Sequence, residues 1–154
     1  MARAGVRPGD LVIDVGAGDG ALTAPLVRAG ARVIAIELHP GRAQRLRDLF
    51  AGAPVRVVQA DAADLHLPRR PFRVVANPPF AITTALLRRL LSPASRLHSA
   101  HLVVPAYVAG RWSAGRGPYP GAWQIRTGAH LPRTAFRPPA PSPAALLVVR
   151  RRLT

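Results

Sequence analysis

The sequence predicts one α/β domain over residues 1–154, with a twisted, mostly parallel sheet, helices on both faces and an antiparallel strand at the C-terminus. Three observations carry this prediction. Short runs of Val, Ile and Leu alternate with segments of helical periodicity. A glycine-rich loop follows the first of these runs. The last two predicted strands are joined by a Pro- and Ser-rich segment, which suits a closing antiparallel pair.

The first unit of this fold is a strand, a glycine loop and a helix. Residues 11–15 form an apolar run that contains Asp14, the loop covers residues 16–20, and apolar positions at helical spacing continue from there to Gly30. Glycines let the backbone approach a ligand closely at the start of a helix. The loop fits the G-x-G-x-x-G/A pattern with Ala21 in the last place, so by itself it does not separate nicotinamide cofactors from others.

Two acidic residues follow the next two predicted strands. The strand at residues 32–37 ends in Glu37, at a position where a carboxylate can accept hydrogen bonds from both hydroxyls of a ribose. Without the loop upstream, a surface or capping role would be the better interpretation. Asp61 lies just past the strand at residues 55–59, where ligands of open α/β sheets gather, and an adenine amino group could donate to it.

The fourth predicted strand, residues 72–76, runs into Asn77-Pro78-Pro79-Phe80. The two prolines fix their φ angles and lack N–H groups, so we expect their carbonyls to remain available as acceptors beside the flat face of Phe80. A planar group that carries an NH2, such as adenine, could be gripped there. Taken alone, an ordinary Pro-rich strand exit is the better interpretation, and the surrounding motifs shift the balance.

The second half is predicted with less regularity. A helix is expected over residues 82–91, a strand over 101–104, a long loop over 109–123, and strands over 130–136 and 146–150. The loop contains two tryptophans and two arginines, which either clamp a nucleotide strand or belong to a small core beneath the loop. These residues are Arg111, Trp112, Arg116 and Trp123.

Charge is divided unevenly along the chain. The formal net charge is +15, all 22 basic residues are arginine, and all seven acids lie at or before Asp64. Residues 65–154 carry fourteen arginines and no acid, which favours a nucleic-acid partner over a merely solvated basic face or a membrane surface. The chain has no cysteine, and we predict no metal site, no signal peptide and no membrane span, hence a cytoplasmic protein.

Together these motifs resemble class I S-adenosylmethionine-dependent methyltransferases, which have a Rossmann-like fold. Residues 14–20 look like their glycine-rich first motif, and residues 77–80 match the (N/D)PP(Y/F) motif of enzymes that methylate amino nitrogens of planar bases. The resemblance implies S-adenosylmethionine as cofactor and no metal. The implied cofactor-binding residues are Asp14, Gly16, Ala17, Gly18, Glu37, Leu38, Asp61, Ala62 and Asn77, and the implied catalytic residues are Asn77, Pro78, Pro79 and Phe80.

The resemblance is closest to the rRNA adenine N6-methyltransferases, and within them to the Erm group. It rests on Gly-Ala-Leu-Thr at residues 20–23, the Asn-Pro-Pro-Phe form, and the tail at residues 136–139 before the last strand. It implies methylation of 23S rRNA, before full ribosome assembly, by a monomer, with resistance to macrolides, lincosamides and streptogramin B. The GC-rich, lysine-free composition is similar to that of an actinobacterial member.

The chain departs from the family pattern in several places. The first strand is predicted to begin at Leu11, so we expect the N-terminal lid over the methionine end of the cofactor to be absent, and the C-terminal helical domain as well. Residues 142–144 read Ser-Pro-Ala where the family usually has Val-Asp-Ser, and residues 105–106 read Pro-Ala where many members have Gln-Arg.

The resemblance implies methyl transfer to N6 of adenine, with the Asn77 side-chain oxygen and the Pro78 carbonyl accepting the amino hydrogens and Phe80 stacking on the base. One alternative is an enzyme of the same fold that acts on DNA adenine or on a protein glutamine. Another is a truncated, weakly active or non-catalytic remnant that binds RNA or cofactor. A nicotinamide oxidoreductase is a more distant alternative, because it would leave residues 77–80 unexplained.

Overall fold

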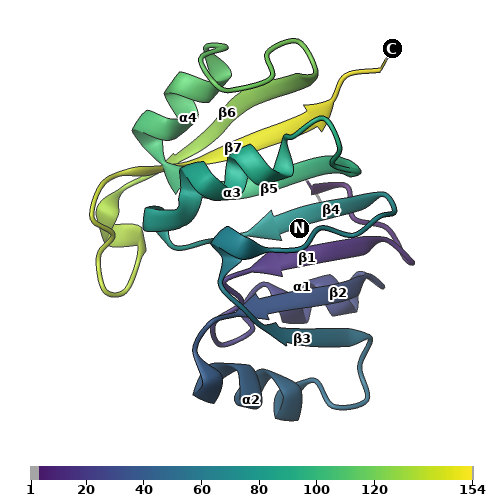
Figure 1. Cartoon of the computed structure of the whole chain (residues 1–154). Coiled ribbons are helices and arrows are strands. Elements are labelled where there is room, and N and C mark those ends of the chain that lie inside the picture. The colour runs from purple at the N-terminus through teal and green to yellow at the C-terminus, as the bar shows by residue number, and fades with distance from the viewer. Residues whose placement is uncertain (1–3, 154) are drawn as a thin grey trace.

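The computed structural model describes residues 4–153 and contains a seven-stranded sheet of order β3-β2-β1-β4-β5-β7-β6, with helices on both faces (Figure 1). Strands β1 to β5 are parallel, and β7 is antiparallel to both β5 and β6. The strands are β1 (Leu11–Val15), β2 (Arg32–Glu37), β3 (Val55–Gln59), β4 (Phe72–Ala76), β5 (Leu97–Pro105), β6 (Trp123–Leu131) and β7 (Ala144–Arg151). The α-helices are α1 (Thr23–Arg28), α2 (Pro40–Leu49), α3 (Thr83–Leu90) and α4 (Ala106–Ser113). The predicted α/β fold with an antiparallel C-terminal strand is confirmed.

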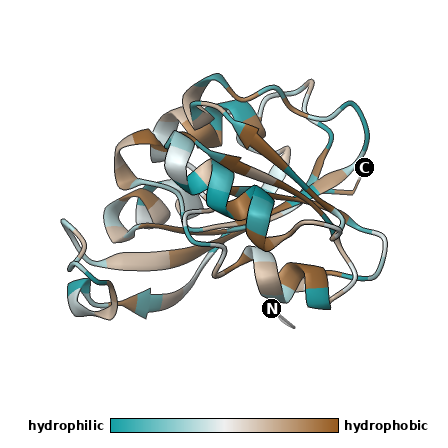
Figure 2. Cartoon of the chain, turned by 90° about the horizontal axis from the view of Figure 1, so that it is seen from below, coloured by the Kyte–Doolittle hydropathy of each residue, from teal (hydrophilic) through white to brown (hydrophobic). Residues whose placement is uncertain are grey.

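The sheet separates two apolar cores. Alternate side chains of a strand point to opposite faces, so Val12 packs with α1 and α2, whereas Ile13 and Val15 pack with α3 and α4. Apolar residues concentrate along the strands, and hydrophilic residues colour the outer helix turns and the loops (Figure 2). Within residues 4–153, no helix has both the length and the apolar character needed to cross a membrane.

The strand order reverses between β1 and β4. Both strands are followed by connections that leave in opposite directions, toward β2 on one side and toward β5 on the other. In open α/β sheets, ligands bind in the crevice at the carboxyl ends of the strands at such a switch point. The loop after β1 and the turn after β4 are the glycine loop and Asn77–Phe80, so the fold brings the two motifs together there.

The second half differs from the prediction in three respects. Strand β5 begins at Leu97, four residues before the predicted start, and β6 ends at Leu131, where the prediction had barely begun it. The loop predicted over 109–123 is wrong in its first part, because α4 extends to Ser113. Gly110 obscured this helix in the sequence, but it lies on the exposed side, where a missing side chain costs no core packing.

Both tryptophans belong to the core. Trp112 is 6% exposed on the inner side of α4, and Trp123 is 4% exposed at the start of β6, where its indole N–H donates to the Leu91 carbonyl at 3.0 Å. An indole ring that is buried and hydrogen-bonded inside is not available for a nucleotide strand. The core interpretation is therefore confirmed, and the stacking interpretation is wrong for these two residues.

Candidate functional site

A cleft of about 820 Å³ opens at the carboxyl ends of β1, β2, β3 and β4. Five segments surround it: the glycine loop, the residues after β2, the residues after β3, the turn after β4, and the connection between β6 and β7. Its lining includes ten of the twelve predicted site residues, namely Gly16, Gly18, Glu37, Leu38, Asp61, Ala62, Asn77, Pro78, Pro79 and Phe80. The other two, Asp14 at the end of β1 and Ala17 within the glycine loop, are buried and do not line the cleft.

The glycine loop packs directly against the turn after β4. Gly16 has a φ of 71°, and a Cβ atom on it would lie 3.1 Å from Cδ of Pro79 and 3.6 Å from Cα of Pro78. Only glycine combines this left-handed conformation with so close an approach. The Gly16 N–H donates to the Ile36 carbonyl at 2.8 Å, which ties the loop to the end of β2 as well.

Glu37 fixes the glycine loop from the end of β2. Its Oε1 accepts from the Gly18 N–H at 2.9 Å, and its Oε2 accepts from the His39 N–H at 2.8 Å. The side chain is only 6% exposed but still reaches the cleft wall. Each carboxylate oxygen can accept a second hydrogen bond, so Glu37 can take two hydroxyl donors from a ligand without losing either backbone contact.

Asp14 is a buried residue beside the glycine loop. It is 1% exposed, and its Oδ2 accepts from the Thr23 hydroxyl at 2.8 Å, which links β1 to the first residue of α1. Burial raises the pKa of the Asp14 carboxyl to about 6; the Thr23 hydrogen bond opposes this shift, and the negative charge of Glu37 adds to it. Asp14 therefore holds the glycine loop in place rather than facing the cleft.

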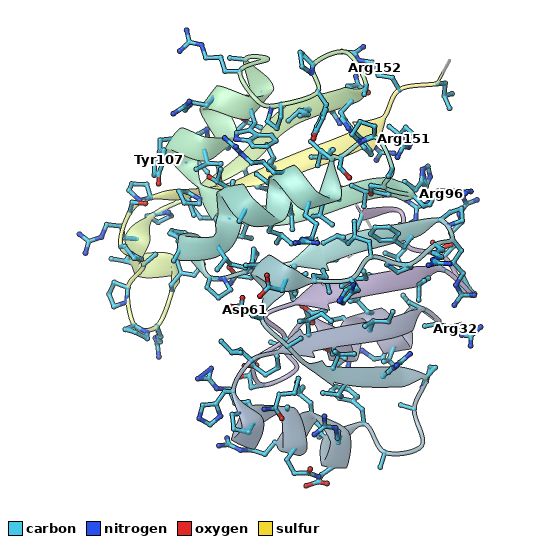
Figure 3. The ribbon with its side chains drawn as sticks, in the orientation of Figure 1. Arg32, Asp61, Arg96, Tyr107, Arg151 and Arg152 are labelled. Atoms are coloured by element: carbon cyan, nitrogen blue, oxygen red, sulfur yellow. The ribbon has the colours of Figure 1, made fainter. Side chains whose placement is uncertain are left out.

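Asp61 and Ala62 form the part of the cleft beyond β3. Asp61 is exposed, and its Oδ1 accepts from the Ala63 N–H at 3.0 Å at the start of the 3-10 turn Ala62–Asp64. Figure 3 shows Asp61 at the edge of the sheet where the strands end. Because the residue is exposed and only one carboxylate oxygen is engaged, Asp61 can still accept a hydrogen bond from an amino group of a ligand.

The expectation that both proline carbonyls of the turn after β4 remain available as acceptors is wrong for Pro79. The Pro79 carbonyl is not free, because it accepts from the Ile82 N–H at 3.2 Å and from the Thr83 hydroxyl at 3.5 Å. A 3-10 turn over Phe80–Ile82 folds these donors back onto it. Across residues 4–153, no donor contacts the Pro78 carbonyl or the Asn77 side-chain oxygen, so these two remain as acceptors at the cleft.

One wall of the cleft was not predicted as part of the site. It consists of residues 135–141, which connect β6 to β7. Phe136 contacts Phe80 edge to face, with ring centroids 6.4 Å apart, and the Arg133 side chain donates to the Ala140 carbonyl at 2.9 Å. The sequence held a signal, since Phe-Arg-Pro-Pro at 136–139 contributed to the resemblance, but nothing local placed it beside Phe80.

The described part of the chain has no group of three or more His, Cys, Asp or Glu side chains able to hold a metal ion. The cleft instead offers glycine backbone, carboxylates, an amide and aromatic rings. These groups suit a nucleoside with ribose hydroxyls and amino donors.

Sheet order and cleft together define a Rossmann-like protein of the class I methyltransferase fold. The structure superposes on that of the 23S rRNA methyltransferase ErmE with a TM-score of 0.86 and 29% sequence identity, covering 98% of this chain and 65% of that one. The family model described as ribosomal RNA adenine dimethylase matches residues 1–120. The chain belongs to this family.

Two relatives differ in the role that their names give. The mycinamicin-resistance protein MyrB of Micromonospora griseorubida is 38% identical over 148 residues, which are 92% of this chain and 47% of that protein. The ribosomal RNA small subunit methyltransferase A of Leifsonia xyli is 42% identical over 121 residues, which are 74% of this chain and 43% of that protein. The chain spans about half the length of the curated relatives it matches.

Proposed function

We propose that this chain transfers a methyl group from S-adenosylmethionine to the N6 amino group of an adenine in 23S rRNA, and so confers macrolide-type resistance. The main support is the contact between the glycine loop and the Asn77–Phe80 turn, which is so close that a Cβ atom added to Gly16 would lie 3.1 Å from Cδ of Pro79. This contact puts a nucleoside-binding loop and a pair of amino-group acceptors in one cleft. A methyl donor and a base can therefore meet there.

The residues present fit the cofactor. Gly16 lines the cleft without a side chain that would obstruct a ligand, and the Glu37 carboxylate keeps acceptor capacity for two ribose hydroxyls. Asp61 would accept from the adenine amino group, and Leu38 and Ala62 would supply apolar contact. When bound, S-adenosylmethionine supplies an electrophilic methyl group on a sulfonium centre.

On the acceptor side, the chain's own groups would position the target nitrogen. The lone pair of an adenine amino group is delocalised into the ring, so the nitrogen is a poor nucleophile. The Asn77 side-chain oxygen and the Pro78 carbonyl would each accept a hydrogen bond from one of the two N–H groups of this nitrogen. These two hydrogen bonds would turn its lone pair toward the methyl group of the cofactor. Phe80 would stack on the base, and its edge-to-face contact with Phe136 would hold the ring angle.

The RNA must present an unpaired or flipped adenine, because the acceptor atoms lie inside a cleft. We propose that residues 1–154 act as one catalytic unit, as a monomer in the cytoplasm, on RNA that has not fully assembled into ribosomes. A specific alternative is small-subunit rRNA, favoured by the 42% identity to the Leifsonia xyli protein.

The test is incubation of the purified chain with tritiated S-adenosylmethionine and deproteinised 23S or 16S rRNA. The variants are Asn77→Ala and, as a matched amide control outside the cleft, Gln124→Ala. We expect N6-methyladenine in 23S rRNA with the wild type and the control. Asn77→Ala should slow transfer by about 100-fold, because it removes one transition-state acceptor, while calorimetry should show that the variant still binds the cofactor.

Each other outcome is informative. Label in 16S rRNA alone would select the small-subunit alternative. Unchanged transfer by Asn77→Ala would overturn the mechanism, and the absence of both label and cofactor binding would overturn the proposed function.

A further inference from the structure

Several arginines lie together at one end of the sheet. Figure 3 shows Arg32, Arg96, Arg151 and Arg152 along the edge opposite Asp61, where the parallel strands begin. This edge is separated from the catalytic cleft by the length of the strands, roughly 17 Å for the five residues of β4. These four arginines therefore lie away from the cleft.

Two grooves follow this edge and meet at one segment. The first, of about 370 Å³, lies at the start of β1, β2 and β3 and is lined by Arg32, Arg56 and Arg70. The second, of about 440 Å³, lies at the start of β5 and is lined by Arg96 and Arg151. Arg70 lines the first groove and its neighbour Pro71 lines the second, so the two grooves adjoin at this segment; we name the two grooves together the arginine edge.

Acids do not neutralise the arginine edge. Asp10 lies at this end of the sheet, but it is paired with Arg73 at 3.1 Å and accepts from the Arg7 N–H. Asp48 accepts from the Gln44 amide and lines neither groove. Within residues 4–153, the Arg73–Asp10 pair is the only ion pair, so none of the five groove arginines has a carboxylate partner within 4.0 Å.

Arg151 is held in place before any ligand arrives. Its guanidinium carbon lies 4.3 Å from the Trp123 ring centroid, and its side chain donates to the carbonyls of Leu97 and Ser95. These two bonds use two of the five N–H groups of a guanidinium. An arginine fixed on an aromatic ring loses little entropy when it binds a phosphate with its remaining donors.

We propose that the arginine edge binds the phosphate backbone of a second segment of the RNA whose adenine enters the cleft. Guanidinium groups match phosphate geometry, and two adjoining grooves suit successive phosphates better than one isolated anion. The choice of RNA rests on the proposed function; the polyanion site itself rests on the grooves. The cleft then selects the base, and the arginine edge sets how the remaining RNA lies on the protein.

The test compares two triple variants with the same loss of charge. The edge variant is Arg32→Gln, Arg70→Gln and Arg96→Gln. The control is Arg28→Gln, Arg45→Gln and Arg126→Gln, three exposed arginines that line neither groove nor the cleft. RNA affinity is measured without cofactor, over a range of salt concentrations, with a domain-length 23S rRNA fragment and with a short hairpin that carries the target adenine.

We expect the edge variant to bind the long fragment about tenfold more weakly, with the slope of log affinity against log salt reduced by about 2. The control should change the affinity by less than about threefold, and neither variant should alter binding of the short hairpin or of the cofactor. Equal losses in both triple variants, or an unchanged salt slope in the edge variant, would overturn the proposal.

The two proposals can fail separately. If the wild type methylates RNA but the edge variant binds RNA as well as the wild type does, the proposal for the arginine edge is wrong and the proposed function stands. If the edge variant binds RNA more weakly but the wild type does not methylate it, the proposal for the arginine edge stands and the proposed function is wrong. If polyglutamate binds as tightly as RNA and with the same dependence on the arginine edge, an acidic protein replaces RNA as its partner.

Discussion

The two walls of the cleft are held in different ways. The wall formed by the glycine loop and Glu37 rests on backbone donors, with contacts of 2.8 to 3.0 Å from Gly16, Ala17, Gly18 and His39. The opposite wall, residues 135–141, rests on the Phe80–Phe136 ring contact and the bond from Arg133 to Ala140. Four backbone hydrogen bonds, two of which reach the Glu37 carboxylate, constrain a loop more strongly than one ring pair and one side-chain hydrogen bond.

This difference suggests a division of labour. A wall fixed from several directions keeps its geometry for a small ligand of constant shape, such as a cofactor. A connection with few anchors can adjust to an RNA loop. Substitutions in the first wall should therefore affect cofactor binding, and substitutions in the second should affect RNA binding.

Glu37→Gln should have the largest effect. The amide can still accept one backbone N–H, but its NH2 group then faces the other donor and loses the charge assistance. We expect cofactor affinity to fall by about 30-fold, equivalent to roughly 2 kcal/mol, as measured by calorimetry. Asp19→Asn, at an exposed carboxylate in the same loop, is the control and should change the affinity by less than about threefold. Equal effects of both substitutions would mean that Glu37 acts only through loop charge.

Gly16→Ala should have the next largest effect, about tenfold in cofactor affinity. Its methyl group would press on the Pro79 ring at 3.1 Å, and neither the proline nor the backbone of the loop can move away easily. Gly52→Ala is a matched control, since Gly52 has a φ of 81° but no atom within 4 Å of its Cβ position. In denaturant unfolding, backbone strain should cost both variants about 1 kcal/mol of stability, and the contact with Pro79 should add to this cost in Gly16→Ala; only Gly16→Ala should weaken cofactor binding. Equal cofactor affinity in the two variants would show that the contact with Pro79 is unimportant.

The buried Asp14 carboxyl beside the glycine loop should make the stability of the protein depend on pH. Because its pKa in the folded chain is raised to about 6 from 3.8, the folded state binds the proton more tightly than the unfolded state. The stabilisation is complete below the unfolded value and is lost as the pH rises through about 6. Between pH 5 and pH 7.5 the wild type should lose roughly 1.4 kcal/mol relative to Asp14→Asn, whose amide oxygen can still accept from Thr23. Urea unfolding of both proteins at the two pH values measures this; a constant difference would exclude titration of Asp14.

The first wall was largely predictable from sequence, because each of its parts is local. A strand, glycines and an acid occur within a few residues, and the switch point of a parallel sheet then brings them together. The Pro79 carbonyl was misjudged, since two prolines in sequence gave no sign of the 3-10 turn that returns the Ile82 N–H to it.

The second wall and the arginine edge could not be predicted in the same way. Residues 135–141 reach Phe80 only because β7 pairs between β5 and β6, and this pairing depends on contacts far apart in the sequence. The number of arginines in the second half is known from the sequence. Whether Arg96 or Arg151 lies at one end of the sheet or the other depends on the direction of β5 and β7 in the sheet, which the sequence does not show. Charge counts therefore predicted the class of partner and not the surface.

Phe136→Leu should have the smallest effect and the most selective one. Leucine retains apolar volume beside Phe80 but lacks the ring edge, so the variant loses the aromatic pair, worth about 0.5 to 1.5 kcal/mol. We expect KM for the RNA to rise by about 2- to 10-fold with cofactor affinity unchanged, because Phe136 packs against Phe80, the ring that we propose stacks on the base. Steady-state kinetics with varied RNA, together with cofactor calorimetry, separates the two constants. If Phe136→Leu weakens cofactor binding as much as Gly16→Ala does, the two walls form one mechanical unit, and the division of labour drawn from their different anchoring is wrong.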